Sequence, residues 1–301
     1  MRSEPHMLDP QKPNYHKIIT ESMLIIERGL LHEIDIDSLI DNTPLPNDEF
    51  LKHFEKIASE SPHQFQNRLR TEYALMLLLV NKASIDDVYA KAAFPDHDTF
   101  SESFLKHFHQ DPEDMINKQR LQHDLISFSQ KPVFGSANQE ERLYGINEKI
   151  VIQNREDLQV QSLRHTGSYE ETYKPWLGLV YRAGAKTTLN QNSTQLGITW
   201  DYPSITDAKH LRYDACIQCE KNIPSLIPQT ISGGLYAIYM HEDGPASLKA
   251  KLTDILCIWL NQSNYRLRLK PIYYIYKNFG TTSFIVNQIK ITVFIPIEKT
   301  P

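Results

Sequence analysis

Aromatic side chains are the residues of this chain whose types point to the most specific chemistry. The sequence holds fifteen tyrosines and three tryptophans, and Trp176, Trp200 and Trp259 all lie after residue 150. Ring faces attract cations and bury large apolar areas, so aromatic walls suit flat or cationic lipophilic molecules. The aromatic content of the second half therefore favours a small-molecule pocket there. The alternative is that these rings pack a sheet against its helices.

Other reactive residues do not form a pattern of their own. No G-x-S-x-G, H-E-x-x-H or P-loop motif is present. Cys216 and Cys219 form a C-x-x-C pair in a segment typical of a strand, where residues three apart face opposite sides. His107 and His109 are two apart in a predicted helix, which is poor metal geometry. We expect no metal site and no cofactor.

Charge is distributed unevenly along the chain. Residues 1–118 hold 12 Lys and Arg against 21 Asp and Glu, a formal charge of −9, whereas residues 119–301 hold 20 against 16, which is +4. No apolar run approaches the ~18 residues that a membrane helix needs, and the first residues show no signal peptide. We expect a cytoplasmic protein of two domains that does not enter membranes.

Residues 1–118 have the apolar period of helices joined by short turns. The same unit occurs twice: a short helix, a turn, a helix with an aromatic pair four residues apart, then Ser-Pro or Asp-Pro. The aromatic pairs are Phe50 with Phe54 and Phe100 with Phe104, and a long apolar helix over 68–80 joins the two units. This layout is typical of a tandem helix-turn-helix.

From residue 149 the period changes to the alternation of strands. Residues 119–148 are polar, and we interpret them as a connector that begins helical and ends as a loop. Strand–helix–strand–strand then occurs twice within 149–301. The pattern predicts an α+β domain with an antiparallel sheet and helices on one face. The predicted strands cover 150–153, 158–165, 194–200, 211–217, 234–241, 271–276 and 289–296.

The second half resembles the GyrI-like domains through five motifs in the family's order. These are Leu163-Arg-His-Thr-Gly-Ser-Tyr, Leu196-Gly-Ile-Thr-Trp-Asp-Tyr-Pro, Arg212-Tyr-Asp-Ala-Cys-Ile, the segment from Gly233 to Pro245, and Trp259-Leu-Asn-Gln-Ser-Asn-Tyr. The resemblance implies a small-molecule pocket between the two repeats. The candidate lining residues are Tyr169, Trp176, Trp200, Tyr236, Trp259, Tyr274 and Tyr276.

One departure from that family concerns its enzymes. The family usually carries a glutamate in the strand matched by residues 271–276, and that carboxylate pairs with cationic ligands or serves hydrolytic members as acid and base. The match places Tyr274 there. A tyrosine can donate a hydrogen bond and offer a π face, but it supplies no carboxylate. We therefore expect no enzyme, and we expect a bound cation to be held by π faces alone.

The first half resembles AraC-type DNA-binding domains through its aromatic pairs, Ser61-Pro62, Arg68-Leu69, Leu77-Leu-Leu and Ala93-Phe94. The residues expected to reach DNA are Asn47, Lys52, His97, Thr99 and Ser101 for base edges and Lys106 for phosphate. Glu102 and Ser103 stand where relatives usually place arginine. Ala93 and Ser59 replace two family glycines.

The two-part order is that of effector-responsive transcription activators. We predict a ligand-responsive transcription regulator with a small aromatic or cationic lipophilic ligand, and with double-stranded DNA and RNA polymerase as further partners. Because phosphate neutralisation dominates DNA affinity, an acidic module favours a second hypothesis. That hypothesis is a ligand-binding or protein-interaction protein whose helix-turn-helix no longer binds DNA. A third is a hydrolase of the GyrI-like branch.

Overall fold

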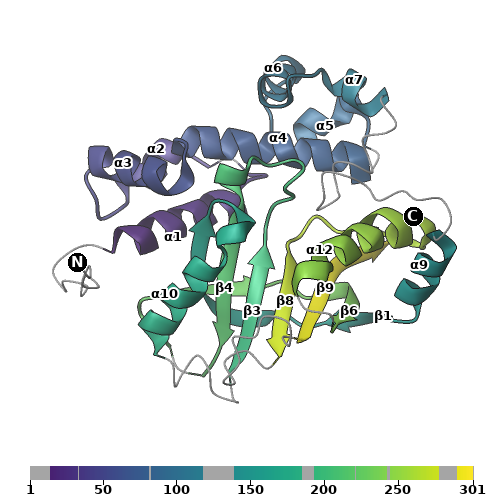
Figure 1. Cartoon of the computed structure of the whole chain (residues 1–301). Helices are drawn as coiled ribbons and strands as arrows, with labels where there is room; N and C mark the ends of the chain where they lie inside the picture. Colours follow the sequence, from purple (N-terminus) through teal and green to yellow (C-terminus); the bar gives the residue numbers. More distant parts are fainter. Residues whose placement is uncertain are drawn as a thin grey trace.

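The computed structural model describes most of the chain as two packed parts, a helical module and a curled sheet with its own helices (Figure 1). No described helix is long and apolar enough to cross a membrane. The described residues are 14–32, 34–80, 83–117, 139–184, 193–220, 222–242, 245–277 and 290–300.

The helical module contains the two predicted helix-turn-helix units. The first pairs α2 with α3 and the second pairs α5 with α6, and the long helix α4 joins them. A proline at position 62 begins α4, which runs without a break through the segment expected as its own helix. The module's elements are α1 (Tyr15–Arg28), α2 (Ile36–Asp41), α3 (Asn47–Ala58), α4 (Pro62–Val80), α5 (Ile85–Lys91), α6 (His97–Phe108) and α7 (Pro112–Asn117).

Each unit has an apolar core of its own. Phe50 and Phe54 of α3 are fully buried against α1 and the start of α4. Phe100 and Phe104 of α6 are fully buried against the second half of α4. Since α4 contributes to both cores, a displacement of α4 would be transmitted to both units.

The second half forms one antiparallel sheet in the order β1-β6-β9-β8-β3-β4-β2-β5, with β7 paired to β9. The strands are β1 (Ile150–Arg155), β2 (Leu158–Thr166), β3 (Thr194–Thr199), β4 (Arg212–Gln218), β5 (Ile227–Ile231), β6 (Gly234–His241), β7 (Tyr265–Leu267), β8 (Ile272–Lys277) and β9 (Lys290–Lys299). The predicted fold class, a tandem helix-turn-helix module followed by an antiparallel α+β domain, is confirmed.

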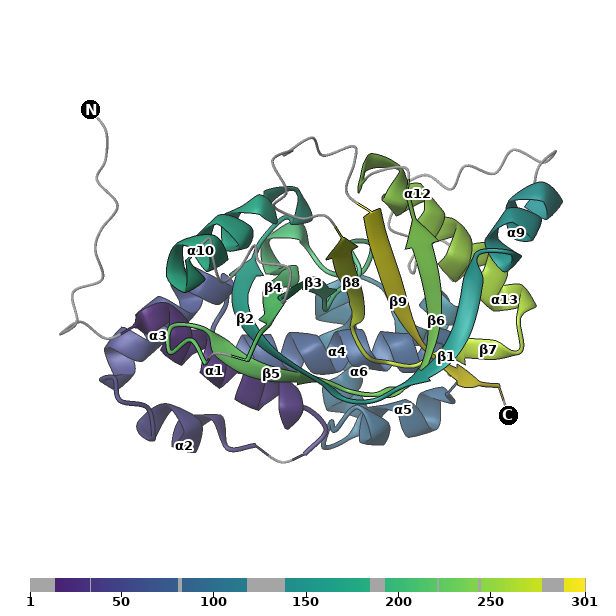
Figure 2. The ribbon, with the colours of Figure 1, turned by 90° about the horizontal axis from the view of Figure 1, so that it is seen from below.

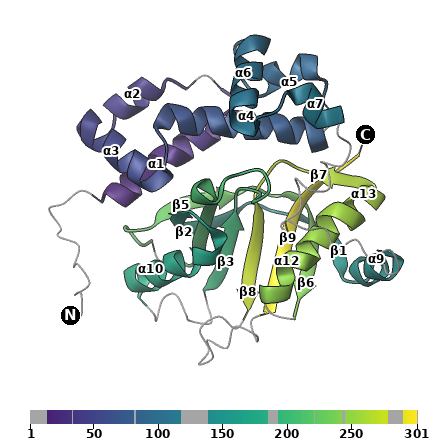
Figure 3. The ribbon, with the colours of Figure 1, turned by 45° about the horizontal axis from the view of Figure 1, so that its top comes forward.

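Two repeats meet at the centre of this sheet, where β3 of the first pairs with β8 of the second. The first repeat is β2, α10 (Tyr173–Ala183), β3 and β4; the second is β6, α12 (Pro245–Asp254) with its continuation through η3 (Ile255–Trp259) and α13 (Leu260–Gln262), β8 and β9. Figure 3 shows α10 and α12 on the same side of the sheet, as predicted. Their inner faces bury Leu179 and Leu252 among others.

The sheet curls because the strand before each repeat pairs with the other repeat. β1 precedes β2 but pairs with β6, and β5 precedes β6 but pairs with β2. The two connections therefore lie together, and the backbone N–H of Gly233 donates to Asp157 Oδ1 at 2.7 Å. A Cβ at position 233 would stand 2.9 Å from the backbone of Glu156, so only glycine fits this corner. Figure 2 shows the resulting curvature.

Three elements differ from the sequence predictions, and one of them is the short strand β7, which was not predicted. The end of the predicted connector is helical, not a loop: residues Gln139–Asn147 form α9, and its Ile146 is buried in the core of the second repeat. Residues 118–138 lie outside the described part. Strand β5 was not predicted, because Pro228 argues against a strand. As the edge strand, β5 tolerates a residue that cannot donate a hydrogen bond.

Candidate functional site

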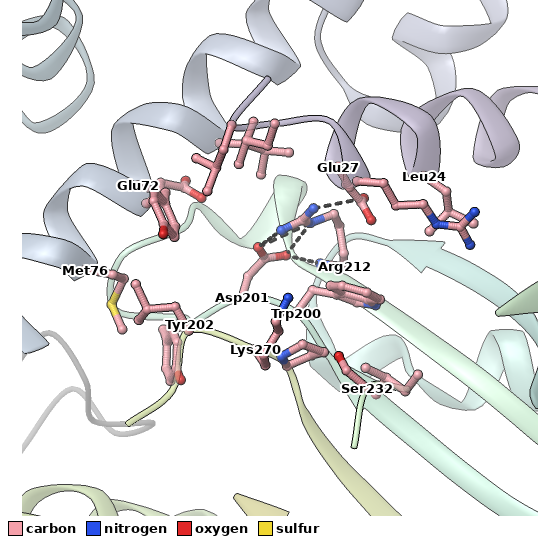
Figure 4. A pocket seen from close by; sticks show the side chains of 18 of the residues that line it. Leu24, Glu27, Glu72, Met76, Trp200, Asp201, Tyr202, Arg212, Ser232 and Lys270 are labelled. Carbon is pink, nitrogen blue, oxygen red and sulfur yellow. Dashed lines mark hydrogen bonds and ion pairs between the residues drawn. The ribbon is translucent and has the colours of Figure 1, made fainter. Parts of the chain in front are cut away.

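A cavity of about 540 Å³ lies between the helical module and the curled sheet (Figure 4). Helices α1 and α4 form one wall, and the other wall comes from the segment after β3, from β4, from the β5–β6 hairpin and from the segment before β8. A volume of this order suits a small organic molecule. The lining residues with polar or aromatic groups include Glu27, Glu72, Tyr73, Trp200, Asp201, Tyr202, Arg212 and Tyr236.

A buried ionic network adjoins this cavity, and two of its members, Glu27 and Arg212, line it. Arg164 of β2 donates to Asp214 of β4 through Nε at 2.8 Å and through Nη2 at 2.9 Å. Glu27 Oε1 of α1 accepts from both Arg164 and Arg212, the latter at 2.8 Å. None of these four side chains is more than 7% exposed. Ion pairs at such depth depend on every partner being present.

The other oxygen of Glu27 has a different environment. Glu27 Oε2 is buried and has no hydrogen-bond partner among the described residues. A buried acceptor without a partner costs free energy, and a charged one costs more. Glu27 therefore retains capacity for a further donor or a cation.

A second group of charges continues the network along α4. Arg68 lies 2.7 Å from Glu60 and 3.1 Å from Glu72, and all three side chains are less than a tenth exposed. His107 of α6 lies 3.3 Å from Glu72. Within the two groups, five carboxylates (Glu27, Glu60, Glu72, Asp201 and Asp214) face three guanidinium groups (Arg68, Arg164 and Arg212). The buried cluster thus has an excess of negative charge.

The buried carboxylates Asp214 and Glu72 stay ionised at neutral pH. Burial alone would raise the pKa of Asp214, but the charge of Arg164 and the hydrogen bonds to the carboxylate lower it below its ordinary value. Burial likewise opposes ionisation of Glu72, yet the charge of Arg68 and a hydrogen bond with His107 lower its pKa. Asp214 and Glu72 therefore keep their negative charges inside the buried cluster.

Trp200 connects the network to the cavity. Its Nε1 donates to Asp214 Oδ2 at 2.7 Å, and the guanidinium carbons of Arg164 and Arg212 lie 5.1 and 5.9 Å from its ring. Two cations of the protein thus already occupy the ring's attractive field. This ring is a wall for a flat molecule rather than the main holder of a further positive charge.

Of the seven aromatic residues predicted to line a pocket, Trp200 and Tyr236 line this cavity. Four of the others gather between α10, β3, β4 and β8, where their rings and hydroxyls contact one another or their neighbours. Tyr276 packs edge-on against Trp176 at 5.5 Å between ring centres and shares a 3.1 Å hydrogen bond with Tyr213. The four are Tyr169, Trp176, Tyr274 and Tyr276. We call these four residues and Tyr213 the aromatic cluster.

Trp259 lies apart from both sites. It is 6% exposed in η3 and stacks on Tyr265, with 6.4 Å between the ring centres. Its packing fits the alternative interpretation of the aromatic residues, in which the rings pack the sheet against its helices. Assignment of all seven residues to ligand binding remains a prediction.

Glu27, Arg164 and Asp214 were missed by the sequence analysis. One signal was present in β4, where Arg212 and Asp214 alternate with apolar residues and the first six residues of the strand are all buried. Charged residues at buried strand positions require partners, and these two could have been flagged for that reason. Nothing local in α1 marks Glu27, because its partners come from strands far along the chain.

The predicted DNA-contacting residues lie on the second helix of each unit. Asn47 and Lys52 are exposed on α3, and His97, Thr99 and Lys106 are exposed on α6, with Ser101 partly exposed. Asn47 Nδ2 donates to Asp41 at 2.8 Å, and Ser101 lies 3.4 Å from His97. Acidic side chains share these surfaces: Asp48 and Glu55 on α3, and Asp98 and Glu102 on α6, are also exposed.

Metal ligation has no support in the described part of the chain. No group of three His, Cys, Asp or Glu residues there could hold an ion. Cys216 and Cys257 are buried, Cys219 is partly exposed just after β4, and none of the three forms a disulfide.

Comparison with known proteins gave matches for both halves. The family described as GyrI-like small molecule binding domain matches residues 148–298, and a helix-turn-helix domain family matches residues 45–118. The probable transcriptional regulator YgiV of Escherichia coli O157:H7 is 27% identical over 115 residues, which are 36% of this chain and 69% of YgiV.

Solved structures were compared as well. The EcmrR chain of a cryo-EM EcmrR–DNA complex is 18% identical, with a TM-score of 0.41, and the match covers 95% of this chain and 98% of that one. The crystal structure of the EcmrR C-terminal domain is 14% identical with a TM-score of 0.41, covering 50% of this chain and 98% of that domain.

Proposed function

Because this chain belongs to the GyrI-like small-molecule-binding family and carries an AraC-type helix-turn-helix domain ahead of that part, we propose that it is a ligand-responsive transcription regulator. A small aromatic or cationic lipophilic molecule binds in the cavity between the two parts and changes the DNA affinity of the helical module.

The position of the cavity is the observation that carries this proposal. Its walls come from α1 and α4 on one side and from the sheet on the other. Helix α1 shares a core with α3, and α4 shares cores with both α3 and α6. A molecule that alters the spacing of these walls would therefore alter the relative placement of the two helices expected to enter DNA grooves.

Two measurements test this function together. A screen of aromatic and cationic dyes for quenching of tryptophan fluorescence should find ligands, because Trp200 lines the cavity. Electrophoretic mobility shifts with a random duplex at low ionic strength should show salt-dependent binding that changes when such a ligand is added. Absence of any duplex binding would overturn the regulator and favour the second function below.

The second candidate is a ligand-binding protein whose helix-turn-helix module no longer binds DNA. The exposed acids Asp48, Glu55, Asp98 and Glu102 on the two recognition helices favour it, since they repel phosphates. Under this function, ligand binding persists and the module serves as one wall of the cavity. RNA polymerase is a partner only of the first candidate.

Hydrolysis is not proposed. Tyr274 takes the position that the resemblance assigns to a glutamate, and its hydroxyl lies 3.2 Å from Thr199 Oγ1 inside the aromatic cluster. Burial raises the pKa of Tyr274 above its ordinary value, so the hydroxyl stays protonated and cannot act as a base at neutral pH.

A further inference from the structure

The cavity needs a counter-charge if it is to hold a cation, and the GyrI-like part contributes little that is free. Tyr274 lies in the aromatic cluster and not in the cavity. Asp201 lines the cavity, but both of its carboxylate oxygens accept hydrogen bonds from Arg212. The sheet therefore presents aromatic rings, and a carboxylate already paired with Arg212, to a molecule in the cavity.

The helical module supplies what the sheet lacks. Glu27 of α1 lines the cavity, its side chain is 7% exposed, and its Oε2 has no hydrogen-bond partner among the described residues. Glu72 of α4 lines the same cavity and belongs to the same cluster, in which carboxylates outnumber guanidinium groups. A buried site with an excess of negative charge is stabilised by a cation.

The positive groups that line the cavity do not cancel this excess. Arg28 and Lys270 also contribute to its lining, but both side chains are exposed, so water and salt screen their charges. Arg212 is the buried guanidinium of the lining, and it is shared by Asp201 and Glu27.

From this arrangement we propose that the cavity binds an organic cation with an aromatic body, and that Glu27 of the helical module provides its counter-charge. The ring system lies against Trp200, and the positive centre lies beside the carboxylate of Glu27. This proposal rests on the proposed function and adds that the site is shared: the GyrI-like part supplies the walls, and helix α1 supplies the charge.

The shared site also gives the ligand a means of acting on the module. Glu27 already binds Arg164 and Arg212 through its other oxygen. A cation at Glu27 competes for the same carboxylate and so weakens the ion pairs that hold α1 against β2 and β4. The ligand therefore binds more tightly when these ion pairs are broken than when they are formed. Such a difference in affinity is what a ligand needs to shift the population between two conformations.

The test compares two probes of one shape on the full chain by titration calorimetry. One probe is (naphthalen-1-ylmethyl)trimethylammonium, and the other is its neutral isostere with carbon in place of nitrogen. The unaltered protein should bind the cation roughly tenfold or more tightly than the isostere, because a hydrogen-bonded or charge-paired buried carboxylate contributes on this order. Equal binding of the two probes would overturn the proposal without any variant.

Variants then assign the charge. Glu27→Gln also disturbs the buried network, so the quantity to compare is the ratio of the two affinities: the preference for the cation over the isostere should fall by roughly tenfold or more. Glu27→Asp, which retains a carboxylate, should keep most of the preference for the cation. The matched control is Glu21→Gln, since Glu21 lies on the same helix, is 44% exposed and pairs only with Lys17 among the described residues; it should change nothing.

The outcomes separate this proposal from the proposed function. If the preference for the cation survives Glu27→Gln, the assignment of Glu27 is wrong, while ligand control of DNA binding can still be observed in mobility shifts. If the cation binds through Glu27 but the duplex affinity does not change, the regulator is overturned and the assignment of the site stands.

Discussion

Glu27 and Arg164 stand 137 positions apart in the chain and form an ion pair with side chains that are 7% and 0% exposed. The pair connects α1 of the helical module to β2 of the sheet. Taking two charges out of water costs several kcal/mol per ion, and their attraction repays this cost only when all partners are in place. Contact between the two parts therefore depends on the network as a whole, not on one pair.

The first prediction concerns Asp214, which carries both bonds from Arg164 and also accepts from Trp200 and Gln229. Asp214→Asn should lower the free energy of unfolding by about 3–5 kcal/mol, because the guanidinium of Arg164 loses its bidentate partner at full burial. Urea denaturation followed by circular dichroism measures the change. The control is Glu242→Gln in the exposed pair with Lys290, which should cost far less because water and salt screen that pair. Equal losses in the two variants would contradict the buried network.

The second prediction concerns Gly197, which lies under the hydroxyls of the aromatic cluster. A methyl group there would overlap Tyr213 Oη and stand 2.7 Å from Tyr276 Oη. Gly197→Ala should therefore destabilise the fold by about 1–3 kcal/mol through overpacking. Addition of Tyr213→Phe, which removes the closer hydroxyl, should recover part of the loss in thermal unfolding.

Gly145 of α9 provides the control for that substitution. No atom lies within 4 Å of a Cβ placed there, so Gly145→Ala should be neutral or should stabilise by up to about 1 kcal/mol through helix propensity. A destabilised Gly145→Ala, or a tolerated Gly197→Ala, would show that close approach of the tyrosines is not what position 197 requires.

Much of the fold follows from the sequence because its periods are local. The repeated aromatic pairs predicted both helix-turn-helix units, and alternation predicted seven of the strands. The backbone conformation persists even where glycine is replaced. Ser59 and Ala93 have φ of 61° and 59°, the left-handed conformation that glycine adopts most easily. Strand β5 was missed because Pro228 is acceptable only at a sheet edge, which no local pattern reveals.

The site was harder to predict, for a physical reason. Aromatic residues indicated a pocket. Four of them, however, pack against one another in the aromatic cluster or form hydrogen bonds with its neighbouring groups, as large buried rings commonly do. The cavity instead arises where two separately predicted parts meet. Its charges come from α1, α4, the segment after β3 and β4, and only the packing of one part on the other brings Glu27 to Arg212.

The third prediction concerns pH. His16 of α1 lies 3.0 Å from the carbonyl oxygen of Arg164, and burial together with the nearby charge of Arg182 lowers the pKa of His16 from 6.5 to about 4. The unfolded chain then binds a proton at a higher pH than the folded chain does. Stability is fully present above pH 6.5 and falls between pH 6.5 and about 4, by at most about 3 kcal/mol from this group.

Urea midpoints across this pH range measure the effect. His16→Gln removes the titrating ring, so the decline between pH 6.5 and 4 should become shallower, while His165 and His210, whose pKa values are also lowered by burial, maintain part of it. The exposed His63 is the control, and His63→Gln should leave the slope unchanged. Identical slopes for the His16→Gln variant and the unaltered protein would contradict the assignment to His16.

The fourth prediction concerns DNA, and it tests whether the acidity of the module limits binding. Glu102 is exposed on α6 between Phe100 and Phe104, where AraC-type relatives usually place arginine. Glu102→Arg should tighten binding to a random duplex several-fold at low salt and steepen the salt dependence by about one unit, because one more phosphate is neutralised. Lys106→Ala should weaken binding and reduce that slope by about one. Mobility shifts or fluorescence anisotropy at several salt concentrations give both quantities.

The control is Glu170→Arg, which makes the same change of charge at an exposed position of the GyrI-like part. If Glu170→Arg tightens binding as much as Glu102→Arg does, net charge alone is responsible and α6 is not the helix that contacts DNA. If only Glu102→Arg tightens binding, the phosphates approach α6, as the resemblance to AraC-type domains implies.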